Sequence, residues 1–146
     1  MVGIFYIKKY CSLTIWDISY IIMVGDYMHI DVEFYTTIDG KKPAKEFLMK
    51  LDPKMRAKLI KTIELLEANG PDLRMPYSEY LGNGIFELRA KVGGNISREL
   101  YFFFSGQKAI LTNGFVKKTQ KTPKKEMELA IKYKHDYESR EGEGNE

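Results

Sequence analysis

Three strand-like segments joined by very short turns constrain the fold of this chain most strongly. The segments and the turns between them are 85–92, Gly93-Gly94-Asn95, 96–104, Ser105-Gly106-Gln107 and 108–116. Apolar residues alternate with charged ones in the first segment, Phe86, Leu88 and Ala90 against Glu87, Arg89 and Lys91. This alternation predicts a strand with one core face and one charged face. Because strands joined by such short turns run antiparallel, the sequence predicts a meander.

A helical hairpin is predicted ahead of this meander. Pro43 begins a short helix, and Asp52-Pro53 supplies an N-cap and a first-turn proline for a second helix that ends at Gly70-Pro71. A strand over 29–36 precedes the hairpin, and a helix follows Thr122-Pro123. We therefore predict an α+β fold: a strand, a helical hairpin, an antiparallel meander of three to four strands, and a C-terminal helix.

The two ends of the chain differ from this domain, which we place at 28–138. Residues 1–27 are rich in Ile and Tyr, but charged residues interrupt every apolar run, which excludes a membrane span. We predict that 1–27 is a leader or a mis-assigned start, with Met23 or Met28 as the true start. A signal peptide and an added strand or helix are the alternatives. Residues 139–146 are polar and predicted to be disordered.

Cysteine and histidine are too scarce for several kinds of site. The single cysteine, Cys11, cannot form an internal disulfide, which favours a reducing, cytoplasmic compartment. The two histidines, His29 and His135, are far apart in the sequence and cannot supply a histidine-based metal motif. We therefore predict no metal and no other cofactor.

The charge is unevenly distributed along the chain. The net charge is only +3, but the segment from Arg89 to Lys125 holds nine basic residues and one acid, a net of +8 that leaves −5 for the rest. Such polarity predicts a polyanionic partner. Tyr101 and Phe115 are interleaved with these cations and offer aromatic faces for nucleic-acid bases. The alternative is that the charges only solvate the sheet and that the aromatic residues belong to the core.

The same segment resembles the RelE/HigB-like toxins of bacterial type II toxin–antitoxin systems, within the RelE/ParE superfamily. The motifs that carry the resemblance are Gly84-Ile85-Phe86-Glu87-Leu88-Arg89, Arg98-Glu99-Leu100-Tyr101, and the run from Gly114 to Pro123, GFVKKTQKTP. It covers about residues 30–137. The resemblance implies a ribonuclease, or mRNA interferase, that cuts messenger RNA in the ribosomal A site. It also implies a cognate helix-turn-helix antitoxin that silences the toxin and through which alone it oligomerises, and no membrane.

The resemblance also implies roles for individual residues. Arg89 takes the place of a basic residue on the strand after the hairpin, and Arg98 matches an arginine that contacts the scissile phosphate. Lys117 and Lys118 match a basic pair that neutralises the transition state or the leaving group. Further RNA contacts are assigned to Lys91, Tyr101, Phe115, Lys121 and Lys124. Some relatives use a tyrosine or histidine near the start of the last helix, where this chain has Lys124-Lys125-Glu126-Met127, so the stacking and acid roles stay unassigned.

These side chains suit a metal-independent cleavage in which the RNA 2′-hydroxyl attacks the adjacent phosphorus. Arginine binds two phosphate oxygens at once and stays charged. Crowding among cations disfavours a charged lysine, so Lys91, Lys117 or Lys118 is a candidate base. Glu87 and Glu99 are expected to pair with Arg89 or Arg98 across neighbouring strands or to act as bases. A non-catalytic nucleic-acid-binding module and a ParE-like gyrase inhibitor are the alternative functions.

Overall fold

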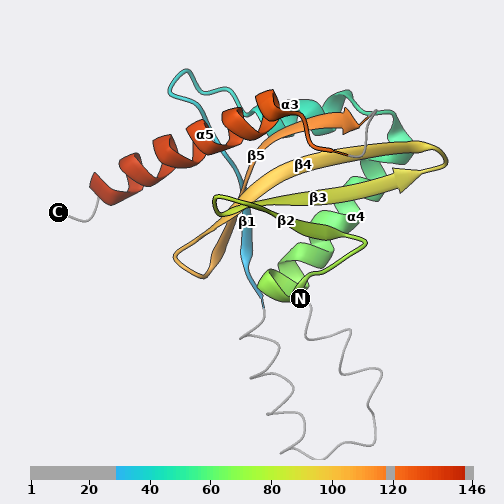
Figure 1. The fold of residues 1–146 in the computed structure, drawn as a ribbon, viewed down its shortest axis with the longest axis horizontal. Coiled ribbons are helices and arrows are strands. Elements are labelled where there is room, and N and C mark those ends of the chain that lie inside the picture. Colours follow the sequence, from blue (N-terminus) through green and yellow to red (C-terminus); the bar gives the residue numbers. More distant parts are fainter. Residues whose placement is uncertain (1–28, 118–120, 144–146) are drawn as a thin grey trace, which may run out of the picture.

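The computed structural model describes residues 29–117 and 121–143, which form a mixed α+β fold (Figure 1). The elements in chain order are β1 (Asp31–Phe34), α3 (Pro43–Lys50), α4 (Pro53–Asn69), a 3₁₀ turn (Gly70–Asp72), β2 (Ser78–Gly82), β3 (Ile85–Val92), β4 (Asn95–Phe104), β5 (Lys108–Lys117) and α5 (Lys124–Glu143). The predicted fold class and element order are confirmed, with β2 as the first of four strands in the meander. The predicted leader, 1–27, lies outside the described residues.

One five-stranded sheet has the strand order β1-β5-β4-β3-β2. Strands β2 to β5 pair antiparallel, as their short turns predict. Strand β1 pairs parallel to β5, with Asp31 opposite Lys108. This parallel pair joins segments far apart in the sequence, and it leaves β2 at the opposite edge of the sheet.

The helical hairpin begins and ends where the sequence predicts. The Asp52 carboxylate accepts hydrogen bonds from the backbone N–H groups of Lys54 and Met55, both at 3.1 Å, and Pro53 follows at the first helical position. These contacts satisfy N–H groups that have no partner within the helix. Gly70, with φ of 54°, ends α4 in a backbone conformation that favours glycine.

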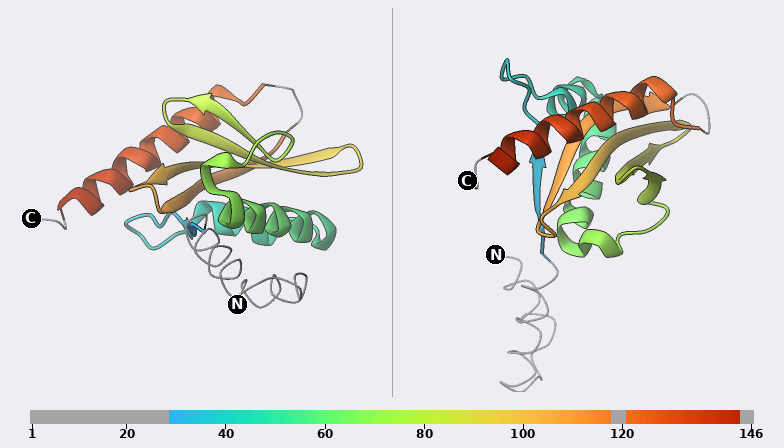
Figure 2. Two further views of the ribbon diagram at one scale, coloured as in Figure 1. Left: turned by 90° about the horizontal axis from the view of Figure 1, so that it is seen from below. Right: turned by 60° about the vertical axis from the view of Figure 1, so that its left-hand side comes forward.

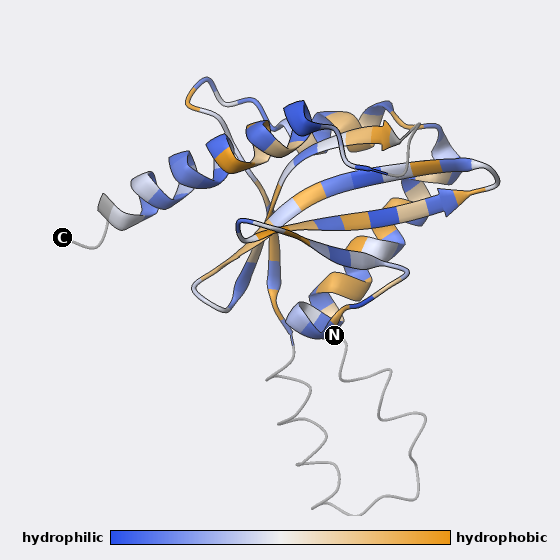
Figure 3. Cartoon of the chain, in the orientation of Figure 1, coloured by the Kyte–Doolittle hydropathy of each residue, from blue (hydrophilic) through white to orange (hydrophobic). Residues whose placement is uncertain are grey.

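The sheet separates two apolar cores, and Figure 2 shows the helices that cover its two faces. Helices α3 and α4 cover one face, and α5 crosses the other. The buried residues of the hairpin-side core are Ile30, Ala44, Leu48, Leu51, Met55, Leu59, Leu66, Leu88, Ala90, Tyr101, Ala109 and Leu111. Those of the α5-side core are Tyr35, Ile85, Leu100, Phe102, Ile110, Phe115, Ala130 and Tyr137. Figure 3 shows the alternation along β3 that places its apolar and charged residues on opposite faces.

Helix α5 continues to Glu143, which corrects the prediction of disorder for residues 139–143. The Arg140 guanidinium donates to the Asp136 carboxylate at 2.6 Å and to the Thr36 carbonyl at 2.7 Å, and it lies over the Tyr35 ring. Tyr35 in turn donates to Asp136 at 2.6 Å. These contacts link the last turns of α5 to the segment after β1, which local polarity did not predict.

Candidate functional site

A buried glutamate gathers two arginines and a threonine on the face of the sheet that α5 crosses. Arg89 on β3 lies opposite Arg98 on β4. The Nε of Arg89 donates to Oε1 of Glu87 at 2.8 Å, and Nη1 of Arg98 donates to the same oxygen. The Thr122 hydroxyl donates to the other oxygen, Oε2. We call Glu79, Glu87, Arg89, Arg98 and Thr122 the arginine cluster.

The cluster leads from the interior to the surface. The Glu87 side chain is fully buried, and that of Arg98 is 6% exposed. Arg89 is 17% exposed and also donates through Nη2 to Glu79, whose side chain is 45% exposed. Its Nη1 lies 3.0 Å from the Met75 sulfur. Arg89 is therefore the cation of the cluster that reaches solvent.

Electrostatically, the cluster balances two guanidinium groups against two carboxylates. Burial lowers the pKa of both Arg89 and Arg98, but the ordinary arginine value is so high that both remain charged at neutral pH. The buried Nε of Arg98 has no hydrogen-bond partner. The contacts with carboxylates fix the positions of the two guanidinium groups and balance their charge. Any excess positive charge at the site has to come from lysines.

The predicted lysines differ in exposure and in their position along the chain. Lys91 is exposed two residues after Arg89, and Lys121 is exposed directly before Thr122. Lys124 begins α5, is 90% exposed, and lies 3.6 Å from the Glu128 carboxylate. Lys117 ends β5 opposite Ile96. Nothing of the Lys117 side chain is described, and Lys118 lies outside the described residues.

Two predicted RNA contacts are corrected by burial. Tyr101 is 1% exposed, its hydroxyl shares a hydrogen bond with Ser78 at 2.6 Å, and its ring packs on Phe86. Burial raises the pKa of Tyr101 to about 12. Phe115 is 9% exposed within the α5-side core. Neither ring is available to stack on a base. Both residues are interleaved with cations along the sequence, but in the folded sheet both rings pack against core residues.

The expected pairing of glutamates with arginines is confirmed for Glu87 and wrong for Glu99. Glu99 projects from β4 to the opposite face of the sheet, in register with Leu88 and Gly114. It is fully buried, neither carboxyl oxygen has a hydrogen-bond partner, and burial raises its pKa to about 8. Glu99 is therefore a protonated core residue at neutral pH.

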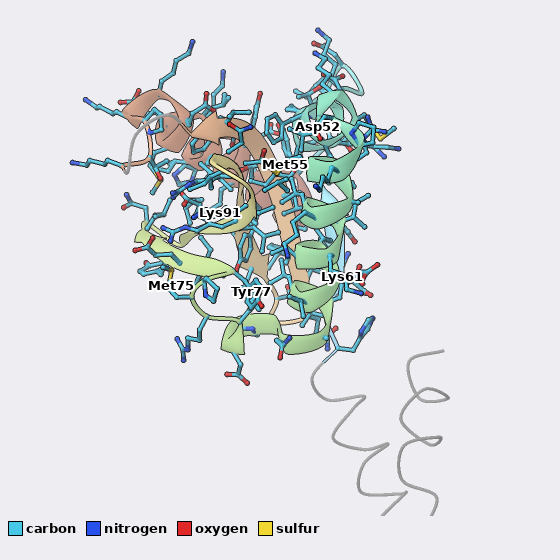
Figure 4. The ribbon with its side chains drawn as sticks, turned by 90° about the vertical axis from the view of Figure 1, so that its right-hand side faces the viewer. Asp52, Met55, Lys61, Met75, Tyr77 and Lys91 are labelled. Carbon is cyan, nitrogen blue, oxygen red and sulfur yellow. The ribbon has the colours of Figure 1, made fainter. Side chains whose placement is uncertain are left out.

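Sequence reasoning missed three residues that complete the surroundings of Arg89: Met75, Glu79 and Thr122. Met75 and Tyr77 lie in the segment that leads to β2, at the edge of the sheet (Figure 4). Glu79 is opposite Glu87 in the β2–β3 register, and the short segment 78–81 carries no clear alternation that would have placed it there. The approach of Thr122 depends on the path of the chain after β5, for which the sequence holds no local signal.

In residues 29–117 and 121–143, no group of three or more His, Cys, Asp or Glu side chains is placed to hold a metal ion. Within the same residues, no helix has the length and apolar character needed to cross a membrane.

The fold and site define a small α+β protein with a cluster of paired arginines and glutamates on a mostly antiparallel sheet. Residues 46–135 match the family described as phage-derived protein Gp49-like (DUF891), and the chain belongs to this family. The family is associated with toxin–antitoxin systems as a RelE-like toxin family, and membership implies a cognate antitoxin as partner. The match includes every residue of the arginine cluster. No curated protein matches the chain.

Proposed function

We propose that this chain is a ribosome-dependent endoribonuclease toxin of the RelE/HigB type, which cleaves mRNA without a metal and is neutralised by a cognate helix-turn-helix antitoxin. The observation that carries the proposal is the geometry at Arg89. The Nε of its guanidinium is bound to the buried Glu87, and Nη2, on the solvent side, is bound to the exposed Glu79. The family's association with toxin–antitoxin systems supports the same proposal.

Arg89 is the residue that we assign to the phosphate undergoing cleavage. A guanidinium binds two phosphate oxygens in a planar arrangement and stabilises charge that develops on them. Glu79 is the exposed partner of Arg89, and its side chain is 45% exposed to water. An incoming phosphate thus takes the place of Glu79, while the contact from Nε to Glu87 keeps the guanidinium plane fixed.

Arg98 acts beneath Arg89 in this proposal. Its side chain is too deeply buried for direct contact with RNA in this structure, and its Nη1 is bound to Glu87. We assign it two roles: it offsets the charge of Glu87, and it leaves Arg89 with a net attraction for phosphate. The contact of Thr122 with Glu87 also holds the segment after β5 close to the arginines.

Proton transfer is assigned to the lysines. Lys91 lies on the same strand face as Arg89, two residues further along. We propose Lys91, Lys117 or Lys118 as the base that accepts the 2′-hydroxyl proton. The ribosome would hold the mRNA in position, so the toxin needs little binding energy of its own.

The test is cleavage of a translated mRNA in a cell-free extract, followed by primer extension. The wild type is expected to produce discrete cuts, and Arg89→Gln is expected to slow cleavage by roughly 100-fold or more, as for loss of a transition-state donor. Lys132→Gln, an exposed substitution on α5, is the charge-matched control and should cleave normally. Urea unfolding checks that all three proteins are folded.

Intact mRNA with the wild type, or equal cleavage by wild type and Arg89→Gln, would contradict the proposal. Salt-dependent binding of RNA without any cleavage products would identify the alternative, a non-catalytic nucleic-acid-binding module. The carboxylate pairing of both arginines is the observation that favours this second candidate.

A further inference from the structure

A basic depression lies beside α4, away from the arginine cluster. It is an open hollow of about 510 Å³, lined by Lys54, Ala57, Lys58, Lys61, Lys91, Val92 and Gly93. The four residues contributed by α4 follow the spacing i, i+3, i+4 and i+7, which places them along one stripe of the helix. Figure 4 shows Lys61 on α4 and Lys91 on the neighbouring strand. The depression therefore joins the helix to the end of β3.

Its positive charge is largely unpaired. All four lysines are exposed, and none of the lining residues is acidic. Lys61 lies 3.6 Å from the Glu64 carboxylate. In the described part of the chain, no carboxylate pairs with Lys54, Lys58 or Lys91. The nearby Asp52 accepts hydrogen bonds from the start of α4 through Oδ1.

The depression shares strand β3 with the proposed site. Lys91 borders the depression and lies only two residues from Arg89 on the same strand. Lys54 and Lys61 are separated by seven residues, or about 10 Å along the helix at 1.5 Å per residue. The depression therefore presents cations from two elements, three from α4 and one from the end of β3.

The lining suits a phosphate backbone better than a peptide. Affinity for a folded or extended peptide usually depends on a few large apolar or aromatic anchors in fitted pockets. Here the apolar contributions come only from Ala57, Val92 and the lysine stems. Binding of a nucleic-acid backbone needs cations alone, since the favourable term is the release of counterions from phosphates.

We propose that Lys54, Lys58 and Lys91 form a second RNA-binding surface, which holds the phosphate backbone of RNA that extends beyond the cleaved position. This inference rests on the proposed function for the identity of the polyanion. It adds a surface on the helical hairpin to a site built on the sheet, and it assigns to α4 a role in binding besides its role in the core.

The test compares two double variants of the full chain with equal loss of charge. Lys54→Gln/Lys58→Gln removes two lysines of the depression, and Lys45→Gln/Lys132→Gln removes two exposed lysines elsewhere. The probe is a fluorescent 2′-O-methyl oligouridine, which cannot be cleaved through its blocked 2′-oxygen. Binding is measured by fluorescence anisotropy over a series of KCl concentrations, and the slope of log K against log salt is compared.

We expect the depression variant to bind about tenfold more weakly and its salt slope to decrease in magnitude by about 1.4, which corresponds to two lost phosphate contacts on a single strand. The control variant should keep the wild-type slope. Equal slopes for the two variants would overturn the inference. So would unchanged RNA binding with lost binding of a labelled oligoglutamate, which would indicate an acidic protein partner. Because the probe is not cleaved, a failure of the proposed catalysis leaves this result unaffected and is recognised separately in the extract.

Discussion

At the scale of single residues, two buried glutamates on opposite faces of the sheet have opposite roles. Glu87 accepts hydrogen bonds from two guanidinium groups and a hydroxyl. Glu99 is equally buried and has no partner. A buried charge is tolerated where it is paired, and a buried carboxyl without a partner takes up a proton instead. The two positions therefore respond differently to the same substitution.

Glu87→Gln is expected to destabilise the fold by about 3 kcal/mol or more, because it leaves the buried guanidinium of Arg98 without its counter-charge and removes one of the two carboxylates bound to Arg89. Urea unfolding measures the change in the free energy of unfolding. Glu79→Gln, which removes the exposed carboxylate bound to Arg89, is the matched control and should cost less than about 1 kcal/mol. Equal losses for the two variants would show that the buried pairing does not stabilise the fold.

Glu99 is expected to make stability fall as the pH rises. Burial raises its folded-state pKa from 4.5 to about 8, so the native state keeps a proton that the unfolded chain releases. The contribution is complete below pH 4.5 and is lost between pH 4.5 and about 8, by about 1.4 kcal/mol per pH unit. Unfolding by urea at pH 5, 6 and 7 should show this slope in the wild type and in Glu64→Gln, an exposed control. Glu99→Gln, which carries no titrating group, should lack it, and an unchanged slope would contradict this account.

At the scale of elements, the sequence correctly predicted those features that depend on residues close together in the chain. The Asp52 cap, Gly70 and the alternation of β3 specified α4 and the meander correctly. The parallel pairing of β1 with β5 and the approach of Thr122 to Glu87 depend on contacts between distant segments, so no local pattern indicated them.

Alternation along a strand shows which residues share a face but not what covers that face. This is why Tyr101 and Phe115 were assigned to an RNA surface, and why the cover over Arg98 was not foreseen.

The packing of α3 on β5 depends on the absence of a side chain at Gly114. A Cβ at this position would overlap the ring of Phe47, whereas one at Gly94 in the β3–β4 turn would meet nothing within 4 Å. Gly114→Ala is therefore expected to cost roughly 1 to 3 kcal/mol through overpacking. Gly94→Ala should change stability far less. Thermal unfolding of both variants measures the difference, and equal midpoints would show that α3 adjusts without cost.

At the scale of the whole molecule, the modest net charge is the sum of a strongly positive segment and a negative remainder. The segment from Arg89 to Lys125 carries +8, but the structure pairs Arg89 and Arg98 with carboxylates in the arginine cluster and exposes Lys91, Lys121, Lys124 and Lys125. The candidate site could be predicted from the sequence as far as Arg89 and Arg98. Its carboxylate partners and its buried side could not, because they depend on which strands become neighbours and on where the chain after β5 returns.

The central proposal is that this chain cleaves mRNA during translation and that Arg89 binds the phosphate at the cleaved position. The most direct measurement is a map of 5′ ends of cellular mRNA after induction of the wild type, Arg89→Gln and the control Lys132→Gln. The account predicts new 5′ ends within translated regions for the wild type and the control, and their near absence for Arg89→Gln at equal protein levels. Growth arrest by the wild type without new 5′ ends, or equal ends with Arg89→Gln, would contradict it.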